Sequence, residues 1–175
     1  MLKFKQILSR KQLRPLINVA LFSILILGFH YFFRYWAYEL KYWPFESLVM
    51  PIYEFLANLL YHNSVWALKH LTTYNFTFND ELREIYIGPG YVGVNYGCSG
   101  FKQFLQWIVL MSFFPGPWKQ KAWFIPVGLV IIHFVNVFRI SSLSVILLYY
   151  PEHWDFTHDW ILRPFFYVVM FGMWV

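Results

Sequence analysis

The chain has 175 residues, of which 59% are hydrophobic, 24% aromatic and only 13% charged, and its net charge is +5. Soluble domains carry charge on roughly a quarter of their residues, so this composition excludes an ordinary water-soluble domain and indicates a membrane protein. Five basic residues precede the first apolar run, which is typical of a cytoplasmic topology signal and argues against a nucleic-acid-binding surface. These residues are Lys3, Lys5, Arg10, Lys11 and Arg14.

The first predicted element is a transmembrane helix over residues 16–34. Its apolar run is long enough to cross a hydrocarbon core of about 30 Å. The run passes into an aromatic belt that includes Tyr35 and Trp36, and it offers no small residues for signal-peptide cleavage. We therefore expect an uncleaved anchor whose N-terminus lies in the cytoplasm.

The second predicted element, residues 47–71, is a helix with one polar side. Glu54, Asn58 and His62 recur four residues apart and so share a helix face. A helix of this kind is typical of the membrane interface, of a re-entrant segment or of the lining of a polar cavity. We expect it to be amphipathic and not surrounded by lipid.

Residues 84–96 have the pattern of a short β-hairpin outside the hydrocarbon, with a turn over residues 88–90. The polar residues 78–81 before it predict a turn. The glycines of this region match neither a dinucleotide-binding nor a P-loop fingerprint, because no helix-opening motif and no lysine follow them. The geometry of the turn is therefore enough to explain why glycine occurs at these positions.

Three later apolar runs predict transmembrane helices over residues 99–115, 122–150 and 160–175. Lys119 and Lys121 fall between the first two, and we expect this loop in the cytoplasm together with the N-terminus. Two crossings must then separate the N-terminus from the loop, so the amphipathic helix does not cross. The middle run is longer than a perpendicular crossing requires, which predicts a tilt, a bend or an extension beyond the membrane.

Together these elements predict an all-α polytopic membrane protein with a single domain over residues 1–175. It contains four transmembrane helices, an interfacial or re-entrant amphipathic helix and a short β-hairpin on the outer face. This topology places Cys98, the outer end of the 122–150 helix and a polar loop over residues 152–159 on the same non-cytoplasmic side. Candidate site residues from distant parts of the chain therefore share one face of the membrane.

Cys98 is the single cysteine of the sequence, which excludes an intrachain disulfide. It lies where a strand-like segment meets the start of an apolar helix. The partial positive charge of a helix N-terminus stabilises a thiolate and favours a nucleophilic sulfur, and the glycines at 97 and 100 leave room for a substrate backbone. The alternative is a structural cysteine that only fills space in the core.

Arg139 lies well inside the 122–150 run, where an arginine must be paired or face a polar cavity. His133, Asn136 and Arg139 recur every three residues and form one oblique polar stripe on the predicted helix. Ionisable residues within a membrane indicate function. The alternative is an arginine that reaches the outer headgroups from a bent helix.

His158 is followed by Asp159 at the end of the polar outer loop, and a histidine beside an acid is typical of a general acid/base with an orienting partner. His153 is a competing candidate in the same loop. The alternatives are a loop that is only solvated and a metal site, although no HxxxH or CxxC spacing supports a metal. The ionisable side chains of this loop are Glu152, His153, Asp155, His158 and Asp159.

A cysteine, an arginine and a histidine on one membrane face are the groups that acyl transfer requires. The thiolate of Cys98 would attack a peptide carbonyl to give a thioester, and Arg139 would stabilise the oxyanion that develops. His158 would protonate the departing amine and then deprotonate the incoming nucleophile. This chemistry requires neither a cofactor nor a metal.

These motifs resemble those of the exosortase/archaeosortase family of membrane transpeptidases, over roughly residues 90–175. The matching segments, in chain order, are Cys98-Ser99-Gly100, Asn136-Val137-Phe138-Arg139-Ile140 and His158-Asp159. The resemblance implies that Cys98 is the nucleophile and that Arg139 and His158 complete the catalytic site. The residues expected to support this site are Ser99, Gly100, Asn136, Asp159 and His153.

The resemblance also implies a substrate class, namely exported proteins with a C-terminal sorting signal made of a short motif, a transmembrane helix and a basic cluster. Cleavage would be followed by hydrolysis or by transfer to a lipid or glycan acceptor. The short chain is similar to exosortases of Bacteroidetes-type bacteria, which implies a multi-pass protein of the inner membrane with its active site on the periplasmic side. The other classes are a non-catalytic membrane assembly or transport component with a polar cavity, and a metal-dependent membrane hydrolase.

Overall fold

The computed structural model describes residues 10–113 and 116–174, with side chains described from residue 17 onward. The cationic side chains on which the N-terminal topology prediction depends therefore lie outside the described residues. Within the described ranges the fold is mostly helical and contains one small antiparallel sheet.

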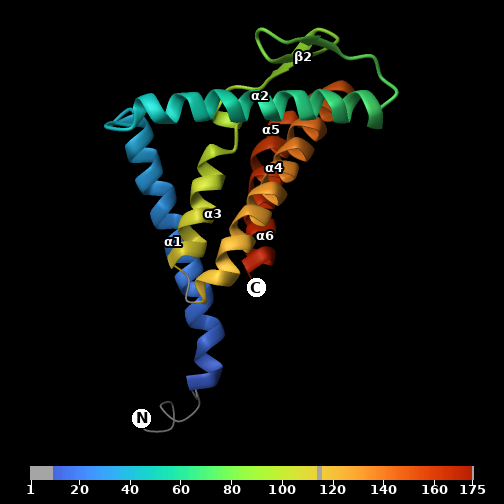
Figure 1. Ribbon diagram of the computed structural model, residues 1–175. Coiled ribbons are helices and arrows are strands. Elements are labelled where there is room, and N and C mark those ends of the chain that lie inside the picture. Colours follow the sequence, from blue (N-terminus) through green and yellow to red (C-terminus); the bar gives the residue numbers. More distant parts are fainter. Residues whose placement is uncertain (1–9, 114–115, 175) are drawn as a thin grey trace.

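A trunk of helices that run side by side forms the lower part of the molecule (Figure 1). These helices are α1 (Arg10–Tyr38), α3 (Phe101–Phe113), α4 (Trp118–Tyr149) and α6 (Arg163–Trp174). Helix α3 packs against both α1 and α4, and α6 packs against α4. Trp107, Ile132 and Met170 are fully buried where these helices meet. The trunk is therefore a packed apolar core in which α3 lies between α1 and α4.

Among the described residues, the two helices long and apolar enough to cross a membrane are Ile17–Tyr38 and Trp118–Tyr149, with mean hydropathies of 1.6 and 1.9. They overlap the first and third predicted spans. Helices α3 and α6 have 13 and 12 residues, which corresponds to only about 20 Å at the rise of an α-helix. The predicted ends of these two spans, 114–115 and 175, lie outside the described residues. The total of four spans therefore remains a prediction.

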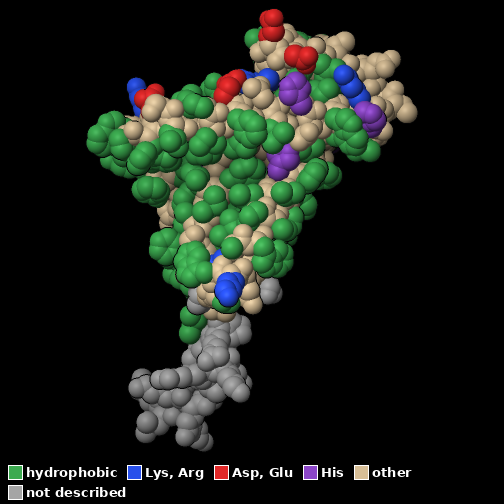
Figure 2. Space-filling model, viewed as in Figure 1, with side chains coloured by type: hydrophobic (Ala, Val, Ile, Leu, Met, Phe, Trp, Pro, Cys, Tyr) green, Lys and Arg blue, Asp and Glu red, His purple; other side chains and the backbone are tan. Residues whose placement is uncertain are grey.

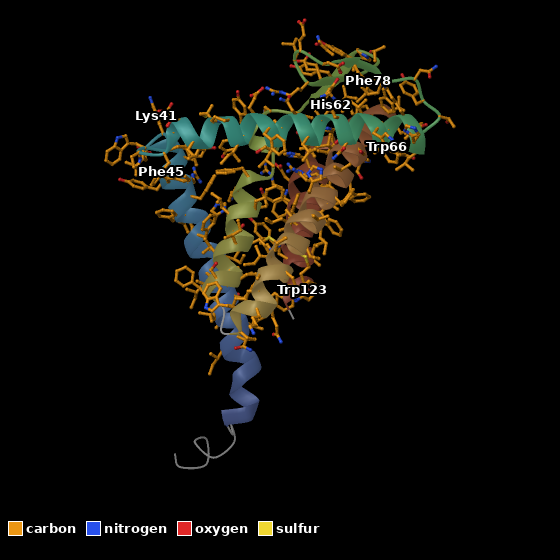
Figure 3. The ribbon with its side chains drawn as sticks, in the orientation of Figure 1. Lys41, Phe45, His62, Trp66, Phe78 and Trp123 are labelled. Atoms are coloured by element: carbon orange, nitrogen blue, oxygen red, sulfur yellow. The ribbon has the colours of Figure 1, made fainter. Side chains whose placement is uncertain are left out.

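The predicted amphipathic helix is α2 (Glu46–Leu71), which lies across the ends of the trunk helices (Figure 1). Figure 3 shows His62 and Trp66 one helical turn apart on α2, and both side chains are exposed. Exposed apolar residues at helical spacing form a stripe along α2, and they are Leu48, Ile52, Phe55, Leu59 and Trp66. Hydrophobic surface covers the trunk and continues onto α2, while charged side chains gather above it (Figure 2). This division suits a helix in the membrane interface.

A three-stranded antiparallel sheet lies above α2 (Figure 1). Its strands, in the order β1-β2-β3, are Thr77–Asn79, Glu84–Ile87 and Gly90–Gly93. Ile85 of β2 pairs with Val92 of β3, and both are buried against α2 and α4. The sequence did not predict β1, because residues 78–81 resembled a turn. The turn lies instead at residues 80–83, since Phe78 pairs with Ile85 and packs on the same core.

The prediction of a loop over residues 152–159 is wrong, because this segment is helical. It forms a 3₁₀ turn (Pro151–His153), helix α5 (Trp154–Phe156) and a π-helical turn (Thr157–Leu162) that continues into α6. Proline at the first position and acidic residues in the first turn favour a helix start. The ring of His158 also stacks on that of Trp154, with 5.0 Å between their centroids. Polar residues that suggested a loop are equally typical of the start of a helix.

Candidate active site

Cys98 lies at the end of a 3₁₀ turn that connects the sheet to α3. Its backbone N–H donates to the carbonyl oxygen and to Oδ1 of Asn95, at 3.0 and 3.2 Å. The hydroxyl of Ser99 donates to the carbonyl of Tyr96 at 2.7 Å and accepts from the N–H of Phe101 at 3.3 Å. These bonds fix the backbone at the start of α3 and leave the Cys98 side chain half-buried.

Asn136 of α4 holds the cysteine segment against the trunk. Its Nδ2 donates to the carbonyl oxygen of Cys98 at 2.6 Å, and its side chain is 1% exposed. Gly100 makes this approach possible, because its φ is +83° and a Cβ there would lie 3.0 Å from Nδ2 of Asn136. A larger residue would strain the backbone and crowd the amide. The predicted supporting residues Asn136, Ser99 and Gly100 thus all act on the position of Cys98.

Arg139 lies one helical turn beyond Asn136 and is only 7% exposed. Its Nη2 donates to Nε2 of His158 at 2.8 Å, so the predicted arginine and histidine are in direct contact. The guanidinium also interacts electrostatically with Cys98. Its Nε is buried and has no hydrogen-bond partner among the described residues. The arginine therefore contacts His158 directly and retains a donor for a further acceptor.

His158 is oriented on its other side by Asp159, whose Oδ1 lies 2.6 Å from Nδ1 of the imidazole. A guanidinium can only donate, so Nε2 must accept from Arg139, and Nδ1 carries the proton that it donates to Asp159. Burial lowers the pKa of His158, and the charges of Arg139 and Arg163 lower it further, although Asp159 opposes them. The imidazole is therefore neutral at neutral pH and has a basic Nε2 that faces the arginine.

His153 lies apart from this cluster. Its side chain is 66% exposed, and its contacts are Nε2 to the carboxylate of Glu152 at 4.0 Å and a stacked ring of Tyr150. Within the described part of the chain, no three His, Cys, Asp or Glu side chains gather where they could hold a metal ion. Of the two candidate histidines, His158 is thus the one that the fold brings against Arg139.

A second polar network connects α2 and the sheet to the segment before the cysteine. Nη1 of Arg83 donates to the carboxylate of Glu54 and to Oδ1 of Asn58, the latter at 3.1 Å. The hydroxyl of Tyr96 donates to the second carboxylate oxygen of Glu54 at 2.9 Å. The hydrogen bond from Arg83 lowers the pKa of Glu54. The polar face predicted for the amphipathic helix therefore reaches the site through Tyr96, two residues before Cys98.

A cavity of about 780 Å³ opens beside Gly97 and Arg139. Other basic residues that line it, among them Arg34 and Lys102, were not recognised as site residues from the sequence. Nζ of Lys102 donates to Nδ1 of His30 at 2.7 Å. Arg34 and Lys102 accompany apolar runs, so the rule that singled out Arg139 could have found them as well.

Comparison with protein families gives a match over nearly the whole chain. The family model described as "Transmembrane exosortase" matches residues 6–175. The chain belongs to the transmembrane exosortase family. Neither the curated proteins nor the solved structures include a match to it. Family membership and the apolar helices together indicate a membrane protein.

In this exosortase, hydrogen bonds join three distant segments of the chain: the turn that carries Cys98, the second half of α4, and the π-helical turn that carries His158. π-helical turns are rare and occur frequently at functional sites. The site combines a half-buried thiol, a guanidinium with an unused donor and a neutral imidazole backed by a carboxylate. Groups of these three kinds can serve as a nucleophile, an oxyanion donor and an acid/base in acyl transfer.

Proposed function

We propose that this exosortase is a membrane cysteine protease/transpeptidase that cleaves C-terminal sorting signals of exported proteins through a thioester on Cys98. The observation that carries the proposal is the continuous contact from Asp159 through His158 to Arg139, beside the segment that Asn136 fixes. A solvated loop or an arginine at the headgroups would not require this contact. Membership of the exosortase family supports a transpeptidase-type role for the protein.

In the first half of the reaction, Nε2 of His158 takes the proton from Sγ of Cys98, and the thiolate attacks the scissile carbonyl carbon. A C–S bond forms, and Arg139 stabilises the oxyanion through its N–H donors. The C–N bond then breaks, and the imidazolium gives its proton to the departing amine. Arg139 donates to Nε2 of His158 in the resting site, so its guanidinium turns to the scissile carbonyl oxygen before Nε2 can take the proton.

In the second half, an incoming nucleophile gives its proton to Nε2 of His158 and attacks the thioester carbon. The C–S bond breaks, and the proton returns to the sulfur of Cys98. Water as the nucleophile gives hydrolysis, whereas an amine or hydroxyl of a lipid or glycan acceptor gives transfer. Asp159 holds the imidazole in the tautomer that both steps use.

The same proposal places the protein in the bacterial inner membrane as a multi-pass protein, with the active site at the periplasmic surface. The concentration of charged side chains over α2 and the sheet, above an apolar trunk, supports this orientation (Figure 2). The partner is an exported protein whose C-terminal transmembrane helix presents the scissile bond at that surface.

The direct test is co-expression of the enzyme with an exported protein that carries a tripartite C-terminal signal, with processing followed by the size of the product. Cys98→Ala should abolish processing while the variant accumulates in the membrane at the wild-type level. Lys119→Gln, an exposed change at the other end of the trunk, is the control and should process normally. Full processing by Cys98→Ala would contradict the proposal and is the result expected of a non-catalytic assembly component.

A further inference from the structure

The cavity beside the site is lined by basic residues from every helix of the trunk. Its volume is about 780 Å³, and none of the described residues that line it is acidic. The basic residues are His30, Arg34, Lys102, Arg139 and Arg163. Two come from α1, and one comes from each of α3, α4 and α6. Segments far apart in the sequence therefore bring positive charge to the same cavity.

The protein itself offsets little of this charge. Asp159 does not line this cavity, although it lines the groove beside it, and its charge is already engaged by Arg163 at 3.1 Å and by His158. Lys102 and Arg139 each donate to a histidine, which accepts only when it is neutral and so supplies no negative charge. Cations gathered among apolar helices are costly without a counter-charge. The cavity is therefore suited to an anion from outside the chain.

An apolar groove continues from the basic cavity along the trunk. It has a volume of about 500 Å³ and runs between α1 and α6. Arg163 and Tyr167 line both spaces, so the two are contiguous. Further from the cavity, the groove is lined by apolar side chains such as Phe22 of α1 and Val168 and Phe171 of α6. The combined space has a cationic head end and an apolar tail.

We propose that this space binds a membrane lipid with a net negative phosphate headgroup, with the phosphate among Arg34, Lys102 and Arg163 and an acyl chain in the α1–α6 groove. Arginine forks match phosphate oxygens, and lysine adds a point charge. Along both helices the cations lie toward α2 and the groove residues lie deeper in the trunk, as a lipid in the adjacent leaflet requires. The site is built for an amphiphile.

The size of the groove favours an acyl chain over a peptide helix. A helix with a diameter of 10 Å and a length of 18 Å occupies about 1,400 Å³, nearly three times the groove volume of about 500 Å³. An extended hydrocarbon chain is much thinner. An acidic peptide is therefore an outcome for the experiment to detect, and the lipid is the occupant that the volumes support.

The test is calorimetric titration of the full chain in neutral detergent with short-chain phosphatidylglycerol, short-chain phosphatidylcholine and inorganic phosphate. Phosphatidylglycerol should bind saturably and most tightly. Arg34→Gln with Lys102→Gln should weaken its binding about 25-fold, since each cation contributes about a fivefold factor near an anionic headgroup. The matched control is Lys119→Gln at the opposite end of the trunk, which should bind like wild type. If the double variant is poorly folded, Arg34→Gln alone should give about a fivefold loss, because its side chain is exposed.

A second arm tests the acyl-chain half of the proposal. Val168→Trp should fill the groove and weaken the binding of phosphatidylglycerol. Val130→Trp, on an exposed face of α4, should leave that binding unchanged. Equal binding of the two lipids, or no loss in the double variant, would overturn the proposal. If inorganic phosphate binds as tightly as the lipid, with an affinity that Val168→Trp does not change, the site is one for free phosphate. If an acidic peptide binds tightly, again with an affinity that Val168→Trp does not change, the site is one for a protein ligand. Either result overturns the lipid assignment.

Lipid binding and catalysis can be tested separately. Cys98→Ala should bind phosphatidylglycerol like wild type, because its sulfur is not part of the proposed headgroup site. Loss of processing with retained lipid binding would support both proposals. Retained processing with retained binding would reject the proposed function and leave the lipid site in place.

Discussion

The two halves of α4 are held by different kinds of contact. In the first half, Trp107 of α3 packs directly against the backbone of α4 at Gly128, where an added Cβ would lie 2.2 Å from Nε1 of the indole. The same Nε1 donates to the carbonyl of Ile125 at 3.2 Å. Close packing of this kind is typical of a rigid apolar core.

From its midpoint onward, α4 is held by polar side chains at three-residue spacing. His133 contacts Asn63 of α2 at 2.8 Å, Asn136 contacts the Cys98 segment, and Arg139 contacts the turn before α6. Each polar residue therefore connects α4 to a different part of the fold. The comparison teaches that one helix serves two purposes, because its first half stabilises the trunk and its second half positions the site. Changes in the two halves should separate stability from activity.

The largest expected effect is on turnover, from Arg139→Lys in the second half. Lysine keeps the charge but loses the planar fork that contacts His158 and that stabilises the oxyanion in the proposed mechanism. We expect processing to slow by about 100-fold to 1,000-fold, the range for loss of an oxyanion donor. Initial rates of processing measure this effect at equal amounts of membrane protein. Wild-type turnover would remove Arg139 from the proposed mechanism.

In the first half, Gly128→Ala should affect stability instead. The new methyl group would clash with Trp107, and overpacking of this kind costs about 1–3 kcal/mol of unfolding free energy. Gly28→Ala in α1 is the matched control, because no atom lies within 4 Å of its Cβ position. It should be neutral or stabilising by up to about 1 kcal/mol. Thermal unfolding in detergent measures both.

The rate per folded molecule should be unchanged in Gly128→Ala, because the clash is far from the cysteine segment. If Gly128→Ala instead had normal thermal stability and lost its turnover, the two halves of α4 would not have separate roles.

A smaller effect is expected for pH dependence. Burial lowers the pKa of His158 below its ordinary value of 6.5, so activity should persist as the pH falls past 6.5 and decline only below it. Asp159 raises this pKa, so Asp159→Asn should move the decline to still lower pH. It should also reduce the plateau rate about tenfold, a part of what a positioned acid/base contributes. Processing rates of the wild type and of Asp159→Asn should be measured across pH. A decline in activity that moves to higher pH in the variant would contradict the prediction.

The same histidine links pH to stability. Its folded-state pKa is lowered, so the stability that depends on its neutral form is fully present above the unfolded value of 6.5 and is lost as the pH falls through the folded pKa.

The smallest effect should come from His153→Ala. This side chain is exposed and lies apart from Arg139, so stability should change by less than about 0.5 kcal/mol. Processing should be nearly normal, whereas His158→Ala should be almost inactive under the same conditions. Parallel processing assays of the two variants measure this difference. An inactive His153→Ala would exchange the proposed roles of the two histidines.

The sequence was most informative where a physical constraint acts within one segment. The apolar runs of α1 and α4 and the one-sided pattern of α2 each depend on local spacing, and helices occur in all three places. A lone intramembrane arginine also indicated Arg139, because such a residue needs a polar partner wherever the chain places it. That partner is His158.

The missed features depend on contacts between segments. Strand β1 has only three residues, and its pairing with β2 arises from the packing of Phe78 on the core, which no local pattern shows. The helical segment over residues 152–159 contains the same polar residues as a loop. The basic cavity escaped prediction because its cations come from four helices whose mutual placement the sequence does not specify.

The most direct test of the central claim is a search for the acyl-enzyme. Enzyme mixed with a substrate that carries the sorting signal should be quenched in acid, and the peptide that contains Cys98 should be examined by mass spectrometry. The account predicts an adduct on Cys98 with the mass of the N-terminal product, which neutral hydroxylamine releases. Steady processing with an unmodified Cys98 at every quench time, together with full activity of Cys98→Ala, would contradict it.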